Sequence, residues 1–233
     1  MVEFFINTWE TLIKYRVIFL EGTKNTLLLS LFAVLLGIIF GTVIALMRMS
    51  SFKPVKWIAL AYIEFIRGTP LMVQLFVIFY GLPALGVKFP EVPFIENFPR
   101  FAAGIFAMSI NSGAYVAEII RSGVQAVDFG QMEAARSIGM KKGAAMRYVV
   151  LPQAVRNILP ALGNEFVVVV KESSIVSVIG ISELMFRSGD VRSITFKVFE
   201  PYFIVAVIYF IITFTLSKLL GVAERRMRKS VER

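Results

Sequence analysis

Residues 27–47 read LLLSLFAVLLGIIFGTVIALM, a stretch without a single charged side chain. A helix that crosses the hydrocarbon core of a bilayer needs about 20 mostly apolar residues. The rest of the 233-residue chain has the same character, since 57% of it is hydrophobic and 18% is charged, where soluble domains average about 25% charged. The sequence therefore predicts an integral membrane protein. It excludes disordered proteins, nucleic-acid-binding proteins and most cytosolic enzymes.

Four more stretches are long and apolar enough to cross a membrane. The predicted fold is thus an all-α bundle of five transmembrane helices, at residues 27–47, 58–82, 101–120, 159–181 and 202–220. The first 24 residues are too charged to cross, and we expect 1–20 to form an amphipathic helix at the membrane interface.

Charges in the connections predict the orientation of the chain. Lys and Arg greatly outnumber Asp and Glu in 48–56, 121–158 and the C-terminal segment, whereas the two signs balance in the N-terminal arm, 88–100 and 183–200. Because connections rich in Lys and Arg stay in the cytoplasm, we expect the N-terminus outside and the C-terminus inside.

Several chemistries are absent from the sequence. The chain has no His and no Cys, which removes the commonest metal ligand and the thiol nucleophile. It also lacks the G-x-x-x-x-G-K-[ST] loop that binds nucleotide phosphates. A Ser–Lys enzyme built on Lys171 and Ser173 would need an oxyanion hole, for which we find no signature. We expect neither enzymatic activity nor a cofactor in this chain.

Residues 128–152, DFGQMEAARSIGMKKGAAMRYVVLP, are unusual for a connection between membrane spans. Asp128 is a good N-cap, and Gln131 three residues later suggests a capping box. Met132, Ala135 and Gly139 fall on one helical face and form a stripe of small and adaptable residues, typical of a docking surface.

The same connection predicts a second short helix. Gly139 can end the first helix with a positive φ, and a helix over 141–150 would stop before Pro152. We therefore expect two short helices that lie parallel to the membrane.

These residues resemble a known signature. Glu133-Ala134-Ala135, followed by Gly139 and then by Leu151-Pro152, is similar to the EAA motif of the membrane subunits of ABC importers. Val149 stands where the motif has Ile, which is a conservative change.

Two other stretches narrow the resemblance to the permeases of polar amino acid importers, of the histidine, arginine and glutamine type. They are Arg67-Gly68-Thr69-Pro70 in the second predicted span and Lys171-Glu172-Ser173-Ser174 in the fourth.

The resemblance implies a division of the chain into an interfacial helix (1–24), a permease domain (25–225) and a basic cytoplasmic tail (226–233). It also implies a bacterial inner-membrane location and several partners. Two permease subunits, which we expect to be copies of this chain, would form the pathway, and an extracytoplasmic binding protein would deliver the solute. Two cytoplasmic ATPase subunits, which bind ATP and Mg²⁺, would contact the coupling residues Glu133, Ala134, Ala135, Gly139 and Pro152.

Polar residues within the third and fourth predicted spans indicate a solute site, because ionisable groups inside a membrane are costly. Asn111, Tyr115 and Glu118 share one helical face, and Glu165 and Glu172 share another. By depth, we expect Glu172 near Asn111 and Glu165 near Glu118.

An amino acid carries both an ammonium and a carboxylate. Lys171 suits the carboxylate, and Glu165 or Glu172 suits the ammonium or a cationic side chain. The groups that orient the solute would be Asn111, Tyr115 and Ser173. The excess of acidic residues favours a basic amino acid such as arginine. Glutamine or another neutral polar amino acid is the alternative, and a stand-alone secondary transporter is a more distant one.

Structural roles compete with these assignments. Lys171 and Glu172 would also fit a polar network between helices. Glu118 would equally pair with Arg121. Glu64 is expected to pair with Arg67 across one turn, and the Gly68–Pro70 segment is expected to kink its helix. Further candidates with weaker arguments are the pathway residues Gln74 and Tyr80 and the packing pair Gly37 and Gly41.

Overall fold

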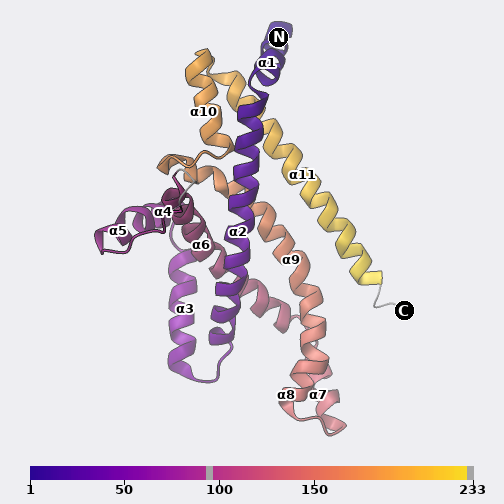
Figure 1. Ribbon diagram of the computed structural model, residues 1–233. Helices are drawn as coiled ribbons and strands as arrows, with labels where there is room; N and C mark the ends of the chain where they lie inside the picture. Colours follow the sequence, from indigo (N-terminus) through magenta and orange to yellow (C-terminus); the bar gives the residue numbers. More distant parts are fainter. Residues whose placement is uncertain (93–96, 230–233) are drawn as a thin grey trace.

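The computed structural model describes residues 1–92 and 97–229 (Figure 1). Residues 93–96 of the predicted 88–100 connection and residues 230–233 of the predicted tail lie outside these ranges. Every element in the described ranges is helical. The α-helices are α1 (Val2–Lys14), α2 (Arg16–Arg48), α3 (Lys53–Arg67), α4 (Leu71–Phe76), α5 (Leu82–Ala84), α6 (Phe98–Gln125), α7 (Phe129–Ser137), α8 (Lys142–Ala145), α9 (Leu151–Glu172), α10 (Leu184–Thr195) and α11 (Phe199–Lys229).

Three of these helices, α2, α6 and α11, are long and apolar enough to cross a membrane. A fourth crossing is formed if the bent pair of α3 and α4–α5 counts as one broken span. The prediction of an all-α membrane protein is therefore confirmed. The region of the fourth predicted span, 159–181, forms α9 and the 3-10 helix η3 (Ser173–Ile179), but α9 includes Arg156, Glu165, Lys171 and Glu172 and is not among the apolar helices.

The second predicted span is broken rather than kinked. The chain bends by 107° between α3 and the α4–α5 segment, at the break that contains Gly68, Thr69 and Pro70. Pro70 lacks a backbone N–H, and its extended conformation (ψ 139°) places it just before the first turn of α4. Figure 1 shows α4 and α5 turned sideways from the axis of α3. A π-helical segment, η1 (Val77–Gly81), connects α4 with α5.

Both ends of the chain differ from the predicted boundaries. The N-terminal helix predicted over 1–20 ends at Lys14, because the backbone leaves helical geometry at Tyr15 (φ −107°, ψ 17°). Residues 16–24, assigned to the interfacial segment, belong instead to α2. At the other end, α11 continues through Lys229, so the segment from 226 to 229 is part of a helix.

Small residues let α2 and α6 pack closely, as the Gly37/Gly41 pair predicts. A Cβ atom on Gly41 would lie 2.6 Å from the Cβ of Val116, and one on Gly37 would lie 3.0 Å from the Cβ of Ser112. This contact fixes the polar face of α6 relative to α2. The main core, which includes Leu29, Ala33, Leu75, Ala107 and Val176, lies between these helices, α4 and η3.

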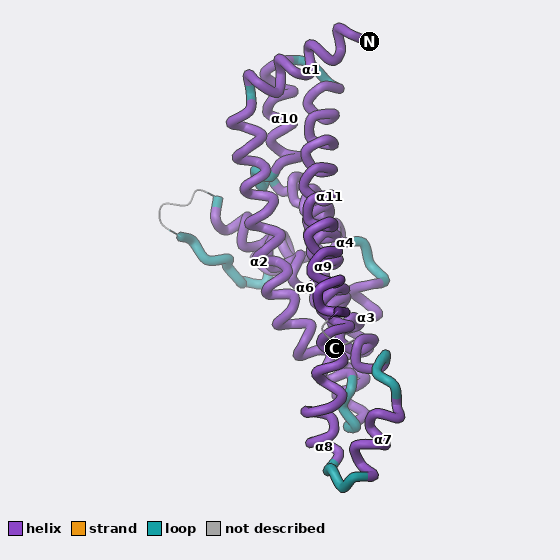
Figure 2. The backbone as a smooth tube through the Cα atoms, turned by 90° about the vertical axis from the view of Figure 1, so that its right-hand side faces the viewer, coloured by secondary structure: helices purple, strands orange, loops and turns teal. Residues whose placement is uncertain are grey.

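The connection between α6 and α9 forms a helical hairpin at one end of the molecule, which Figures 1 and 2 show from two sides. The second helix does not stop before Pro152. Instead α8 continues through a π-helical turn, η2 (Met146–Val150), directly into α9. Pro152 stands in the first turn of α9, where the missing N–H costs little, and the wider π turn precedes it.

Candidate functional site

Two polar layers cross the bundle, and α6 contributes to both. The first, which we call the middle layer, consists of Gln74, Asn111, Ser112 and Glu165. Within it, the Nδ2 atom of Asn111 donates to the Oε1 atom of Gln74 at 2.9 Å, and both side chains are buried. The sequence did not predict that Gln74 lies level with Asn111. A straight helix would place Gln74 elsewhere, and the break before α4 brings it to this position.

Gln74 also closes the break between α3 and α4. Its Nε2 atom donates to the carbonyl oxygens of Ile66 at 2.7 Å and Thr69 at 3.0 Å, and lies 2.9 Å from the Thr69 hydroxyl oxygen. These are carbonyls that the interrupted helix leaves without their usual partners. A single buried amide therefore connects the broken span to α6.

Glu165 of α9 faces α6. Its Oε1 atom accepts a hydrogen bond of 2.8 Å from the Ser112 hydroxyl, and the side chain is only 7% exposed. The prediction that Glu165 lies level with Glu118 is therefore wrong. Both helices extend beyond the predicted spans, to Gln125 in α6 and back to Leu151 in α9. Ser112 and Glu165 then stand about 20 Å from these two ends at 1.5 Å per residue.

Tyr115 follows one turn further along α6. The Arg67 guanidinium lies over its ring, with the central carbon 5.5 Å from the ring centre, a cation–π arrangement. The predicted Glu64–Arg67 pair is not among the ion pairs of the described residues. Arg67 is the last residue of α3, and the break that follows leaves it free to turn toward α6.

The remaining predicted solute residues lie at the end of α9 and the start of η3. Lys171 is exposed and Glu172 is half-buried. Ser173, the first residue of η3, is fully buried, and its hydroxyl donates to the carbonyl oxygen of Val170 at the end of α9 at 2.8 Å. The structure brings Asn111, Ser112 and Glu165 into one layer, whereas Lys171 and Glu172 lie one to two turns further along α9.

The second layer, the end layer, consists of Arg48, Lys56, Glu118 and Arg121, which lie at the end of α2, the start of α3 and the C-terminal part of α6. Figure 1 shows the turn between α2 and α3 toward the end of the bundle that carries the hairpin. Glu118 accepts two hydrogen bonds from the Arg121 guanidinium, at 2.8 and 3.0 Å. The Nε atom of Arg48 lies 3.8 Å from the other carboxylate oxygen. Of the two predicted alternatives for Glu118, the structure contains the salt bridge with Arg121.

The hairpin confirms two local predictions. The Asp128 side chain accepts a hydrogen bond of 2.7 Å from the backbone N–H of Gly130, which caps α7. Gly139 has φ +91° just after α7. The side chain of Gln131 does not complete the predicted capping box, because its Oε1 atom accepts from Gln153 at 3.3 Å. This contact holds α7 against the start of α9.

The small-residue stripe is divided, because Ala135 is buried and Met132 half-buried whereas Gly139 is exposed. Ala135 is 5% exposed, and Met132 is half-buried in the contact between α7 and η2. The exposed surface of the hairpin is formed instead by larger residues, with Phe129 72% and Ile138 81% exposed. Glu133, Ala134 and Pro152 are exposed as well. Ala135 therefore serves the packing of the hairpin, while its outer face carries the bulky apolar Phe129 and Ile138 together with Glu133 and Ala134.

A buried carboxylate at the opposite end was missed by sequence reasoning. Glu183 is fully buried and caps α10, where it accepts hydrogen bonds from the backbone N–H groups of Met185 at 2.8 Å and Phe186 at 2.7 Å. Tyr209 of α11 donates to it at 3.0 Å. The available signal was Glu183 itself, an acidic residue immediately before a helix, where it can serve as an N-cap.

Residues 33–229 match the family of binding-protein-dependent transport system inner membrane components. The chain is 40% identical over 212 residues to the probable glutamine ABC transporter permease GlnM of Bacillus subtilis, covering 91% of this chain and 94% of that protein. It is 39% identical to the arginine transport system permease ArtQ of the same organism, covering 91% and 93%.

Solved structures agree with this fold. A chain in the crystal structure of an amino acid ABC transporter with histidines superposes with a TM-score of 0.86 at 54% identity, covering 92% of this chain and 96% of that one. The inward-facing methionine transporter MetNI, at 16% identity, shares the fold with a TM-score of 0.73. The resemblance to polar amino acid ABC permeases is confirmed, and such components are non-catalytic subunits without cofactors.

Proposed function

We propose that this chain, which belongs to the family of binding-protein-dependent transport system inner membrane components, forms the translocation pathway of an ATP-driven importer. The proposed solute is a basic amino acid such as arginine. The coarser function, a permease subunit of an ABC importer, follows from the family. The solute is argued from the middle layer.

The observation that carries the proposal is the difference between the partners of the two carboxylates, Glu118 in the end layer and Glu165 in the middle layer. Glu118 is paired with Arg121, with Arg48 close by. Glu165 is more deeply buried and accepts a hydrogen bond from a neutral hydroxyl, while the ion pairs among the described residues include no cation for it. A buried carboxylate is costly unless a cation accompanies it. The guanidinium or ammonium of a solute would supply that charge.

The other predicted residues have complementary roles in this proposal. Asn111 uses its amide nitrogen for Gln74 and keeps its carbonyl oxygen as an acceptor for the solute. Tyr115, 37% exposed, would border the path. Lys171 and Glu172, one to two turns from Glu165, would contact the carboxylate and ammonium ends during passage. Ser173 has its hydroxyl turned to Val170, so we assign it only a supporting position.

A neutral solute is the second candidate. The identities to the glutamine and arginine permeases, 40% and 39%, are too similar to distinguish these solutes. Glutamine would leave Glu165 without a cation, which is why we favour a basic amino acid.

Coupling to ATP would occur through the α7–α8 hairpin. Its exposed Phe129 and Ile138 fit a groove on an ATPase subunit, with Glu133 and Ala134 between them on the outer surface. Ala135, Gly139 and Pro152 would fix the shape of the hairpin. Replacing Glu133 with Ala should weaken co-purification of the ATPase while the chain still inserts, and unchanged co-purification would remove Glu133 from the contact.

The assembly we propose contains two copies of this chain, two ATPase subunits and an extracytoplasmic binding protein. In each copy α9 with η3 forms the fifth crossing, because its polar residues would line the shared path rather than face lipid. The N-terminus would lie outside and the C-terminus, with the hairpin, in the cytoplasm.

The test is uptake of radiolabelled arginine into proteoliposomes that contain this chain and its ATPase, with glutamine and histidine as competitors. We expect uptake to need ATP and to be blocked best by basic amino acids. ATP-dependent uptake blocked mainly by glutamine would overturn the assignment of the solute, and uptake independent of ATP would overturn the importer itself.

A further inference from the structure

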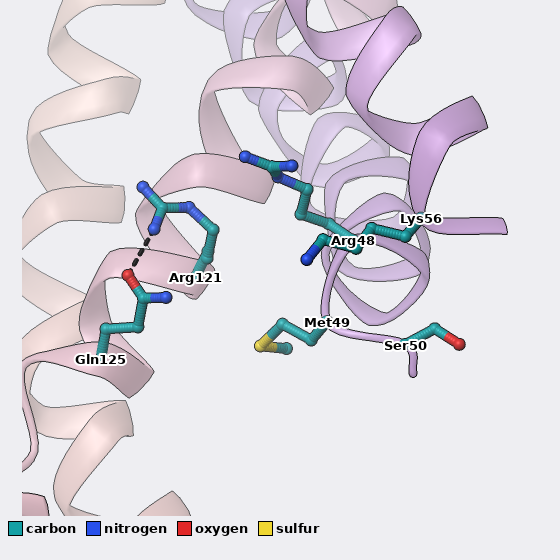
Figure 3. A pocket seen from close by; sticks show the side chains of 6 residues that line it. All are labelled: Arg48, Met49, Ser50, Lys56, Arg121 and Gln125. Atoms are coloured by element: carbon teal, nitrogen blue, oxygen red, sulfur yellow. Dashed lines mark hydrogen bonds between the residues drawn. The ribbon is translucent and has the colours of Figure 1, made fainter. Parts of the chain in front are cut away.

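A cavity of about 320 Å³ lies beside the end layer, between the ends of α2 and α6 and the start of α3. Its lining is strongly basic and contains Arg48, Lys56 and Arg121, with Met49, Ser50 and Gln125 completing the wall (Figure 3). Figure 3 shows the side chain of Arg48 extending toward α6 and the Arg121 guanidinium bonded to Gln125 of its own helix. The volume is within the range of small-molecule sites, about 300–1,000 Å³.

The cavity has a surplus of positive charge and an unused donor. Three cations face one neighbouring carboxylate, Glu118, which is already bonded to Arg121. The Nε atom of Arg48 and the Oε1 atom of Glu118 face each other at 3.8 Å, too far for a hydrogen bond, and both are buried without another partner. An anion with several acceptor oxygens would balance the surplus positive charge of the three lining cations.

An apolar cavity of about 250 Å³ lies deeper along the same helices. It is lined by Phe40, Val43 and Ile44 of α2, Tyr62 of α3, and Phe106 and Ile110 of α6. Ile44 and Arg48 are one turn apart on the same face of α2, and Ile110 and Arg121 share a face of α6. The basic cavity and the apolar cavity thus follow one another along α2 and α6, with lining residues about 6 Å apart on α2 and about 16 Å apart on α6. We call the two cavities together the groove.

Residues at the mouth indicate the level of the membrane interface. Trp57 stands next to Lys56 and is 66% exposed, and Phe52 is 63% exposed. Trp favours the boundary between headgroups and hydrocarbon. Lys56 would then be at headgroup level, while the apolar cavity lies within the hydrocarbon.

We propose that this groove binds an anionic glycerophospholipid, with its phosphate among Arg48, Lys56 and Arg121 and an acyl chain in the apolar cavity. The basic cavity alone would accept any phosphate. The apolar cavity further along the same two helix faces favours the lipid over a soluble anion, because only the lipid fills both.

Native mass spectrometry of the full-length protein tests the proposal, with dioleoyl phosphatidylglycerol and dioleoyl phosphatidylcholine as probes. We expect phosphatidylglycerol to be retained preferentially. Lys56→Gln and Arg48→Gln should each lower its retention about fivefold, from roughly 1 kcal/mol for each basic residue at a membrane surface. Lys56 is exposed, so its replacement should not disturb folding.

Lys53→Gln is the matched control, since Lys53 is an exposed lysine on the same helix that does not line the cavity. An equal loss in Lys53→Gln would show a general surface-charge effect and overturn the proposal, as would equal retention of the two lipids. Val43→Trp should fill the apolar cavity and lower retention too, and Val43 is 53% exposed, which leaves space for the larger ring. Displacement of the lipid by millimolar inorganic phosphate would assign the basic cavity to a soluble anion and contradict the lipid.

Discussion

The two polar layers on α6 have opposite charge balances. In the middle layer, Asn111 donates to Gln74 and Ser112 donates to Glu165, the one ionisable group, which has no cation among the ion pairs of the described residues. Glu118 lies six residues after Ser112, about 9 Å further along α6. In the end layer this one carboxylate faces three cations, on Arg48, Lys56 and Arg121. The same helix therefore presents a site short of positive charge and a site short of negative charge.

This difference indicates which carboxylate is structural. A carboxylate that already holds two bonds from Arg121 has little left to offer a solute, however polar its surroundings. A carboxylate buried with only a hydroxyl retains most of its capacity to bind a cation. Judged by burial alone, Glu118 and Glu165 would both be candidates for binding the solute. The partner that each carboxylate already has distinguishes them. Glu183 belongs with the structural group, because backbone N–H groups and Tyr209 occupy its oxygens.

The largest effect should follow from neutralising the middle layer. Glu165→Gln keeps the acceptor for Ser112 but removes the charge, and a charged hydrogen bond contributes about 1.5–3 kcal/mol. Arginine uptake at low concentration should fall about 10- to 100-fold, measured as initial rate in proteoliposomes. Wild-type uptake by this variant would mean that the middle layer does not bind the cation.

A large effect on stability should follow from removing the amide that ties the broken span to α6. Gln74→Leu removes the hydrogen bonds to the Ile66 and Thr69 carbonyls and the acceptor of the Asn111 amide, and the Ile66 carbonyl keeps only a long bond of 3.5 Å from the Thr69 hydroxyl. The loss should cost about 3 kcal/mol of unfolding free energy. Thermal unfolding in detergent measures the loss.

Ser109→Ala is the control for this comparison, since Ser109 is buried and bonds only to the Ile105 carbonyl of its own helix. It should cost less than about 1 kcal/mol. Equal losses for both variants would contradict the special role of the Gln74 network.

The smallest effect should come from the end layer. Glu118→Gln weakens an ion pair whose side chains are 20% and 28% exposed, so the expected loss of stability is about 1 kcal/mol or less. Arginine uptake should stay close to that of the wild type. A loss as large as that of Glu165→Gln would place Glu118 in the solute path and remove the distinction between the layers.

Much of the fold could be predicted from composition and spacing. Runs with at most one charged residue located α2 and α11, and Asp128 and Gly139 predicted the two ends of α7. Gly37 and Gly41 indicated a helix-packing face, although not its partner α6. These features depend on residues close together in the chain, where local propensity decides.

The site could be predicted only in part, because it depends on the register between distant helices. Asn111 and Glu165 were identified as polar groups within the spans. Their relative depths were wrong because α6 continues beyond the predicted span end at residue 120 and α9 begins before the predicted start at residue 159. Gln74 was not ranked, since the 107° break that directs it toward Asn111 rotates everything after Pro70. The burial of Ala135 likewise depends on the packing of α7 against α8 and η2.

The most direct measurement is a structure of the assembled transporter with bound arginine. Our account predicts the guanidinium or ammonium group about 2.7–2.9 Å from the Glu165 carboxylate, with the Glu118–Arg121 pair unchanged. Arginine bound away from Glu165, or with its carboxylate turned toward the middle layer, would contradict it.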